Sequence, residues 1–550
     1  MKILNQNLQN PIRVNHRGFL SQSNKRFILT ENLTDSLIFS IILVDNVEEI
    51  TVFTGEMKIF KENGDTLFEG DFSVVSKSGD YYIDAGGYRS RQFVIYDGAY
   101  DIALRTMLQY FTYQRCGHAL GWAGECHLDD GVIFETGEKV DLSGGYHQSC
   151  DLRKSPGGIS IGIVGLINFA LKDNSSWGKI LTKDEVKWAC DYYVKVIQEN
   201  GAMYNTLNEP FGWEGRVFYK SPAPSSAQWN TTIALALGSI YFKDIDSEIS
   251  KKYLETSLRS YNYMQGERDY QQYKHPSTYP LGMDPDSFYE TCRRNSSADL
   301  AYQISAAAIL YKATFNNKFI DEIKVILPKF LKFIDGFVIK RDDNMEKTVC
   351  ASCSYSWLYG GILSLLDAYE LVGNIYNLKD IIEASLDSLC NYIDKSVWKN
   401  AQMLYSNEDL NKVDGHENKS RKDALMPLID YNGYFYSVRH SFEPTHSCYF
   451  GLFLARGSKL LRNPKYMKYA QYVVDYLLGA NELDSSRVYA VGYNQCPQKS
   501  YGQFFPSTPF IPGAVGVGYS SIDVTKDITS EYDMPCVGLA MHLLSEVSSK

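Results

Sequence analysis

The stretch from Asp141 to Asp151 reads DLSGGYHQSCD and leads from a polar loop into the apolar segment 159–171. Its two adjacent glycines permit a tight turn, and the spacing of the apolar residues that follow predicts a helix. A carboxylate between such a turn and such a helix can face a cleft and accept a proton from water. It can also be an ordinary helix N-cap, so a catalytic role for Asp151 requires a partner group.

Around and after this stretch the sequence pattern is typical of long helices. Apolar residues recur at helical spacing in about a dozen segments, with few convincing strands among them. Helices joined by both short turns and long polar loops suit a toroid in which inner and outer helices alternate and the long loops build a cleft at one end. We therefore predict an all-α domain over residues 99–550, with helices at 102–113, 159–171, 183–200, 227–241, 250–265, 297–314, 320–337, 357–372, 380–395, 450–461, 465–479 and 536–547.

The N-terminal part of the chain has a different pattern. Short runs that alternate apolar and polar residues occur at 26–29, 37–43, 57–60, 72–75 and 91–95. Turn signals separate them, among them ENGD at 62–65 and AGG at 85–87. This pattern is typical of a small antiparallel β-sandwich, which we place at residues 1–98.

Length, composition and charge agree with two folded domains. The 550 residues exceed what one hydrophobic core usually organises. Hydrophobic residues make up 44% and aromatic residues 14%, whereas disordered chains lack that apolar content. The 55 basic and 65 acidic side chains give a net charge of -10, which provides no general attraction to nucleic acid or to anionic membranes. Neither is expected as a partner.

The chain is expected to be cytoplasmic. Its first residues carry polar Asn and Gln where a signal peptide needs a continuous apolar stretch, and no run reaches the roughly 18 apolar residues of a spanning helix. The 11 cysteines, an odd number without regular spacing, fit thiols or metal ligands better than a disulfide framework. The sequence leaves the oligomeric state open.

The densest cluster of reactive side chains lies between positions 116 and 151. Cys116, Cys126, His127 and His147 offer two thiolates and two imidazoles, the donors that fill a closed tetrahedral zinc shell. The loop lacks a CxxC or HxxxH pair, so small buried thiols and scattered polar histidines are an equal alternative on spacing alone.

Two further carboxylates lie near the C-terminus. Glu531 and Asp533 precede the final apolar helix predicted at 536–547. One interpretation is a catalytic acid that partners Asp151. The other is a pair of acids that stabilise the positive end of a helix dipole.

Five segments, in the right order and over nearly the full length, resemble glycoside hydrolase family 9. This is the cellulase family with an N-terminal immunoglobulin-like domain and an (α/α)6 barrel. The segments are Val14–Leu20 (VNHRGFL) for the family's VNQxGYxP, Gln109–Gly117 (QYFTYQRCG) for FxxQRCG, Asp141–Asp151 for DVSGGWHDAGD, Asn463–Asn481 for NPKY and ILGAN, and Pro512–Val515 for the PGA loop.

The resemblance implies hydrolysis of a β-glycosidic bond with inversion. Asp151 matches the last residue of DAGD and would be the general base, and Glu531 matches the C-terminal glutamate that acts as general acid. In an inverting enzyme the two carboxyl groups stand roughly 6.5–9.5 Å apart to admit the attacking water. The acid needs a raised pKa to stay protonated.

The resemblance also implies ligands for the protein. Some family members hold a structural zinc at the places of Cys116, Cys126, His127 and His147, which favours the zinc interpretation of this set. Calcium is possible by the same analogy, although no loop here spells out a cage of oxygen ligands. Aromatic side chains can stack on sugar rings or fill a core, and both interpretations apply to each aromatic residue here. The side chains expected to contact the sugar are Trp122, Trp213, Trp357, Tyr359, Tyr501, Phe505 and Asp533.

The chain departs from the family pattern at functional positions. Gln148 stands where the family has the first DAGD aspartate, which helps to hold the attacking water. An amide can hydrogen-bond that water but contributes no charge. The interval 493–505 contains no His or Arg, whereas family endoglucanases carry an HxxR-type segment for gripping cellulose there. Long cellulose chains are therefore not the expected substrate.

Two functions are compatible with this pattern. The first is an exo-acting glycosidase that removes a sugar from short β-linked oligosaccharides, cello-oligosaccharides or glucosamine-containing oligomers. The second is a catalytically silent family member that binds carbohydrate or a protein partner through the same cleft. Gln148 supports the second function, while the retained Asp151 and Glu531 favour the first.

Overall fold

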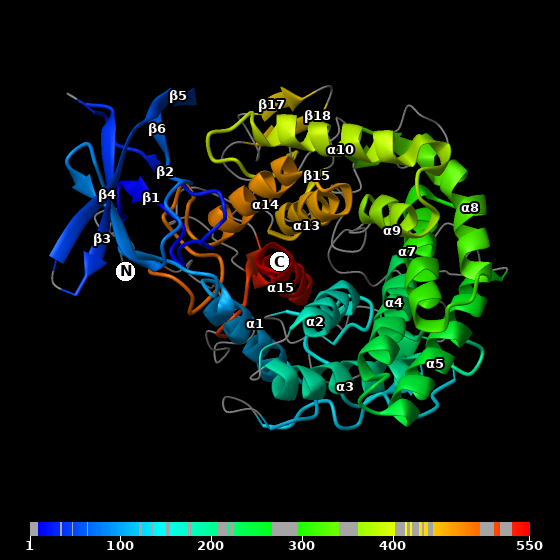
Figure 1. Ribbon diagram of the computed structural model, residues 1–550. Coiled ribbons are helices and arrows are strands. Elements are labelled where there is room, and N and C mark those ends of the chain that lie inside the picture. The colour runs from blue at the N-terminus through cyan, green and yellow to red at the C-terminus, as the bar shows by residue number, and fades with distance from the viewer. Residues whose placement is uncertain are drawn as a thin grey trace.

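The computed structural model describes residues 9–33, 36–46, 48–62, 64–119, 124–133, 136–149, 154–173, 175, 178–206, 217–219, 225–266, 295–339, 361–401, 413–414, 419–420, 428–431, 434–437, 444–494, 511–517 and 531–549. Within these ranges the chain forms a ring of helices with a β-sandwich against its side (Figure 1).

Six of the described helices close an inner ring, in which each helix packs against the next and the last packs against the first. In order around the ring they are α2 (Ser160–Lys172), α4 (Ser225–Phe242), α7 (Ser297–Thr314), α9 (Leu363–Val372), α13 (Pro444–Leu461) and α15 (Met534–Ser548). Figure 1 shows them gathered around the middle of the barrel.

A second layer of described helices surrounds this ring. The outer helices are α1 (Asp101–Tyr113), α3 (Gly178–Val196), α5 (Ser247–Gln265), α8 (Lys318–Phe330), α10 (Leu378–Ile393) and α14 (Pro464–Leu477). Outer and inner helices alternate along the chain, and each outer helix packs on an inner neighbour. Because the chain reverses direction at each step, the inner helices all begin at the same end of the barrel.

The two layers differ in the distribution of apolar residues. Helix α15 is buried without interruption from Met534 to Val547, as expected for a helix surrounded by others. Helix α8 buries one face only, with Phe319, Ile323 and Phe330 among its inward side chains. Helix α15 is therefore part of the core, and the outer helices shield the inner ring from water.

Helices α2 and α15 approach each other through glycines. A Cβ atom on Gly165 would lie 2.2 Å from the carbonyl oxygen of Gly538, and one on Gly538 would lie 2.2 Å from that of Gly162. Only glycine allows backbones this close. The contact brings together the two inner helices that follow Asp151 and Glu531 in the chain.

The N-terminal domain is a sandwich of antiparallel strands. One sheet has the order β1 (Ile12–Arg13), β2 (Arg26–Leu29), β6 (Asp65–Asp71), β5 (Lys58–Glu62). The other has the order β4 (Glu48–Glu56), β3 (Ile38–Asp45), β7 (Gly79–Ala85), β8 (Tyr88–Arg89), with β9 (Phe93–Ile95) also paired to β7. Phe19, Phe27, Phe39, Phe72 and Phe93 pack edge to face or tilted between the sheets. The boundary predicted between residues 98 and 99 falls between β9 and α1.

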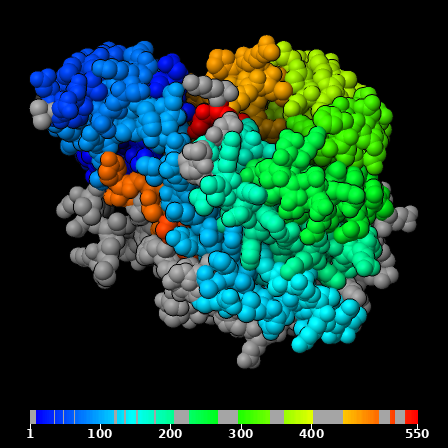
Figure 2. Space-filling view, turned by 60° about the horizontal axis from the view of Figure 1, so that its bottom comes forward, coloured from blue at the N-terminus to red at the C-terminus, as the bar shows by residue number. Residues whose placement is uncertain are grey.

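The sandwich is fastened to the barrel by the segment after α10. Arg26 donates hydrogen bonds to the carbonyl oxygens of Val397 (2.7 Å) and Trp398 (2.8 Å). Glu62 accepts hydrogen bonds from the Ser396 hydroxyl (2.8 Å) and the Val397 amide (2.7 Å). Figure 2 shows the sandwich lying directly against the barrel.

Several predicted boundaries were wrong. The run 72–75 is no strand, because Phe72 turns into the sandwich core and the Val75 amide closes a turn onto its carbonyl. The helix predicted at 320–337 ends earlier, at Phe330 of α8, and a 3-10 turn (Leu331–Phe333) leads into a small hairpin whose tip is Gly336, with φ +59°. The helix predicted at 357–372 begins at Leu363 within the described residues.

Short strands also lie between the helices, where few were predicted. They are β10 (Val132–Ile133), β11 (Asn205–Thr206), β12 (Val217–Tyr219), β13 (Ile334–Asp335), β14 (Val338–Ile339), β15 (Val413–Asp414), β16 (Lys419–Ser420), β17 (Leu428–Tyr431), β18 (Tyr434–Ser437), β19 (Gly516–Val517) and β20 (Glu531–Tyr532). None of the described helices has the length and apolarity needed to cross a membrane.

Candidate active site and metal centre

The main chain joins the two segments that carry the predicted catalytic carboxylates. The Met534 amide donates a 3.0 Å hydrogen bond to the carbonyl oxygen of Gln148. Next to it, Ser149 and Asp533 form an antiparallel bridge. The segments before α2 and before α15 therefore meet at the end of the barrel where the inner helices begin.

Three of the predicted residues lie at or beside this junction. The main-chain carbonyl of Gln148 accepts the hydrogen bond from Met534, and Gln148 is partly exposed to solvent. Asp533 occupies the N-cap position of α15. The backbone of Glu531 belongs to β20, where it pairs with Val517 of β19. Other predicted site residues lie outside the described residues, namely Trp122, Asp151, Trp213, Trp357, Tyr359, Tyr501 and Phe505.

A buried carboxylate holds the Gln148 segment from its other side. Glu185 of α3 forms an ion pair with Arg115 (2.9 Å) and accepts a hydrogen bond from the hydroxyl of Tyr146 (3.0 Å). The His147 amide donates to the carbonyl of Gln114 (2.8 Å). The segment is thus bonded on one side to the end of α1 and on the other to the start of α15. Sequence analysis missed Glu185, because an isolated acid on an amphipathic helix carries no motif.

A second buried pair anchors the chain directly after Asp151. The ammonium group of Lys154 lies 3.0 Å from Asp130 Oδ2 and donates to the carbonyl of Leu142 (2.6 Å). Both side chains are fully shielded from solvent. Removing one partner of such a pair leaves an uncompensated buried charge, which typically costs about 3–5 kcal/mol. The pair therefore ties the chain at Lys154, which leads into α2, to the loop that contains Cys126 and His127.

The structure brings the four predicted metal ligands together. One ligand atom from each of Cys116, Cys126, His127 and His147 lies within 4.8 Å of all the others. The sulfur of Cys126 is 3.3 Å from Nε2 of His147, and the rings of His127 and His147 have centroids 5.2 Å apart. Cys116 and both histidines are buried, and Cys126 is partly so.

The chemistry of this cluster fits a zinc ion. The hydrogen bond from Cys116, together with the neighbouring histidines, lowers the pKa of the Cys126 thiol, whereas burial raises the pKa of Cys116 well above its usual value. Nδ1 of His147 is buried without a hydrogen-bond partner. Two thiols and two imidazoles converging in a buried place form the Cys2His2 set of structural zinc sites. Because His147 directly precedes Gln148, an ion here would also fix one end of the Gln148 segment.

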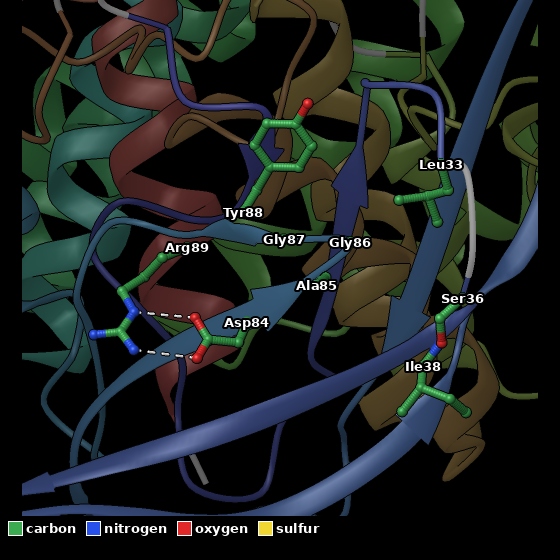
Figure 3. A pocket seen from close by; sticks show the side chains of 9 residues that line it. All are labelled: Leu33, Ser36, Ile38, Asp84, Ala85, Gly86, Gly87, Tyr88 and Arg89. Carbon is green, nitrogen blue, oxygen red and sulfur yellow. Dashed lines mark hydrogen bonds and ion pairs between the residues drawn. The ribbon is translucent and has the colours of Figure 1, made fainter.

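A separate hollow of about 710 Å³ lies on the sandwich (Figure 3). Its walls come from the β7–β8 hairpin and from the chain before and at the start of β3, with Leu33, Ser36, Ile38, Asp84, Ala85, Gly86, Gly87, Tyr88 and Arg89 as lining residues. Arg89 is already paired with Asp84 (3.0 Å) and Glu49 (2.9 Å). The hollow contains none of the predicted site residues.

Comparison with known proteins assigns the chain to a family. The model of glycosyl hydrolase family 9 matches residues 100–509, and that of the cellulase N-terminal ig-like domain matches residues 7–90. The chain belongs to glycoside hydrolase family 9. This family 9 protein is accordingly a glycosidase, and its predicted fold, an immunoglobulin-like sandwich followed by an (α/α)6 barrel, is confirmed.

The family 9 protein resembles curated and solved relatives over most of its length. A cellodextrinase of Butyrivibrio fibrisolvens is 23% identical over 516 residues, which cover 87% of this chain and 84% of the cellodextrinase. A metagenome-derived family 9 endoglucanase has a TM-score of 0.72 at 18% identity, covering 98% of this chain and 99% of that one. A zinc-binding triple mutant of the family 9 endoglucanase J30 has a TM-score of 0.70 at 16% identity, with coverage of 96% and 100%.

Proposed function

We propose that this family 9 protein hydrolyses β-linked oligosaccharides with inversion, using Asp151 as general base and Glu531 as general acid. The observation that carries the proposal is the bridge between Ser149 and Asp533. Asp151 follows Ser149 by two residues and Glu531 precedes Asp533 by two, so both carboxylates stand equally close to this junction in the chain.

In this mechanism the water is activated by Asp151 while Glu531 protonates the leaving oxygen. An inverting enzyme needs space for the water, so its carboxyl groups stand roughly 6.5–9.5 Å apart rather than the approximately 5 Å of a retaining one. Gln148 takes the place of a second water-holding carboxylate. Its amide can orient the water by a hydrogen bond but adds no negative charge, so we expect slower turnover than with an aspartate.

We propose short oligosaccharides, cleaved from one end, as the substrates. The similar cellodextrinase carries a name that refers to short glucose oligomers. The interval 493–505 of this chain also lacks the His and Arg residues that would grip a long cellulose chain. Glucosamine-containing oligomers belong to the same proposal, as does the cytoplasmic location that would supply short imported sugars.

We propose further that Cys116, Cys126, His127 and His147 hold a structural zinc. A neighbouring fold is that of a zinc-binding family 9 variant, and the donor set here is the one that zinc prefers. A closed set of four protein ligands leaves no open position for catalysis, so the ion would stabilise the loop and take no part in the reaction. Calcium, which prefers oxygen donors, does not suit this set.

The test is hydrolysis of a panel of aryl β-glycosides and short β-linked oligosaccharides, with glucosamine oligomers included. We expect release of a single sugar with inverted configuration, lost in Asp151→Asn and in Glu531→Gln. Sugar binding without turnover on the whole panel would contradict the proposal and favour the silent family member.

A further inference from the structure

Asp484 is a buried carboxylate that the proposed mechanism does not use. It lies in the loop after α14, and its side chain is 1% exposed. Its Oδ1 lies 2.9 Å from Nε2 of His16. Its Oδ2 accepts hydrogen bonds from the Asn10 amide (2.8 Å) and from Arg91 (3.1 Å). All three of these partners belong to the sandwich, so Asp484 is a point where the barrel loop is held by the other domain.

The surroundings of His16 show which group donates the hydrogen bond between His16 and Asp484. Nδ1 of His16 accepts a hydrogen bond from the Tyr493 amide (3.3 Å), so the ring proton is on Nε2 and points to Asp484. A Cβ atom on Gly479 or on Gly492 would lie 2.6 Å or 2.9 Å from the His16 ring. The two glycines thus make room for the histidine inside the barrel loop.

Tyr493 provides a second attachment of the same loop. Its hydroxyl donates to the carbonyl of Gln92 in the sandwich (2.7 Å), and the guanidinium of Arg91 lies 5.2 Å from the centre of its ring. Asn494 closes the loop onto its own start by donating to Asp484 Oδ2 (3.0 Å). The loop after α14 is therefore held to the sandwich at two points, Asp484 and Tyr493.

From this loop, hydrogen bonds run to the segment 513–516, which leads into the strand that pairs with the one carrying the predicted acid. The Tyr489 amide donates to Ala514 (2.9 Å), and the Gly513 amide donates back to Tyr489 (2.9 Å). The Gly516 amide donates to Arg487 (3.3 Å). Strand β19 then pairs with β20, and Val517 of β19 is the pairing partner of Glu531 of β20. The path from the sandwich to Glu531 is continuous and involves main-chain bonds after Asp484.

We infer that Asp484 is a positioning residue for Glu531: His16 and Arg91 hold it, and the segment after it sets the place of β19 and hence of β20. The inference rests on the proposed function, since it assigns Glu531 the role of general acid. A displacement of about 1 Å at a reacting group can cost on the order of 10²-fold in rate. Loosening the Asp484 anchor should therefore weaken acid catalysis without removing the acid.

The test uses Asp484→Asn and two kinds of substrate. Both oxygens of Asp484 face donors, so the amide nitrogen of Asn must oppose one of them. Cleavage of an oligosaccharide, whose leaving oxygen needs a proton, should fall about tenfold or more. Cleavage of a dinitrophenyl β-glycoside, whose leaving group needs no proton, should fall less than about threefold.

The matched control is Glu62→Gln. Glu62 also joins the sandwich to the barrel, but its hydrogen bonds to Ser396 and Val397 lie outside the path to Glu531. Glu62→Gln should leave the ratio of the cleavage rates of the oligosaccharide and the dinitrophenyl β-glycoside unchanged. Equal losses on both substrates in Asp484→Asn, a changed ratio in Glu62→Gln, or an unchanged ratio in both would overturn the inference. If Asp484→Asn does not fold, Tyr493→Phe must shift the ratio in the same direction, and an unchanged ratio there would overturn it.

A second readout separates this inference from the proposed function. Hydrogen exchange at the amides of Tyr489, Gly513 and Gly516 should accelerate in Asp484→Asn and stay unchanged in Glu62→Gln. Exchange that is unaltered in Asp484→Asn would overturn the coupling whether or not the protein is active. A wild-type protein without turnover on any substrate would instead contradict the proposed function.

Discussion

The hydrogen bond from the Met534 amide to the carbonyl of Gln148 joins the start of the last inner helix to the segment before the first one. The inner ring closes at this place, because α15 packs against α2. Closure of the ring therefore also brings Gln148 and Ser149 beside Asp533 and Met534.

Introducing a carboxylate at position 148 should accelerate hydrolysis. In the proposed mechanism, Gln148→Asp adds a negative charge beside the water that Asp151 would activate, so we expect kcat to rise by about tenfold or more. The measurement is steady-state hydrolysis of a short β-linked oligosaccharide. Gln148→Asn is the matched control, since it keeps an amide and should not gain activity. A Gln148→Asp variant no faster than wild type would show that the amide does not limit the rate.

Loss of one cysteine ligand should release the metal. We expect about one zinc per chain by elemental analysis of the purified protein and almost none in Cys126→Ser. The variant should also unfold at a lower temperature, because the four ligands tie the segment before Gln148 to its neighbours. Cys190→Ser changes a buried thiol outside this cluster and should keep its zinc. Wild-type protein without zinc after purification in zinc-containing medium would refute the assignment.

Adding one methyl group between α2 and α15 should destabilise the barrel. In Gly538→Ala the new Cβ would lie 2.2 Å from the Gly162 carbonyl, so the two helices must move apart. We expect a loss of at least about 1–3 kcal/mol in the free energy of unfolding, together with lower activity. Gly124→Ala is the control, because its Cβ would meet nothing within 4 Å. Denaturant unfolding with equal midpoints for the two variants would contradict the close approach of these helices.

Asp475 should make the protein less stable as the pH rises. It is buried between Asn15 (2.9 Å) and Gln471 (2.8 Å), and burial raises its pKa to about 7. The folded protein therefore holds a proton that the unfolded chain releases near pH 4, so this contribution to stability is present at low pH and is lost between about pH 4 and 7.

Asp475→Asn removes that titration while keeping the shape of the side chain. Its free energy of unfolding relative to wild type should increase from pH 5 to pH 8, as measured by chemical denaturation at both values. A constant difference between Asp475→Asn and wild type would mean that Asp475 does not titrate in this range.

The sequence predicted the fold, and the four side chains that converge in the proposed metal site, for identifiable reasons. The helices of the barrel have apolar residues at helical spacing, so their existence was visible, although Pro444 to Tyr449 of α13 were missed because polar His446 and Ser447 interrupt the pattern. The cluster of Cys116, Cys126, His127 and His147 was recognisable because few residue types bind zinc, and the structure brings these four side chains together.

Other features depend on tertiary contacts that leave no local signal. Strand β4 was missed because it lies at the edge of its sheet and exposes Ile50 and Val52, which weakens the alternation. Glu185 and Asp484 acquire their roles only when distant segments meet them. Phe72 was assigned to a strand because it is apolar, yet it packs into the core from a turn.

The most direct test of the central claim is the configuration of the sugar released from a short β-linked oligosaccharide, followed by proton NMR during the first turnovers. We expect the inverted α-anomer as the initial product, and no product from Asp151→Asn. Release of the β-anomer, or full activity in Asp151→Asn, would contradict it.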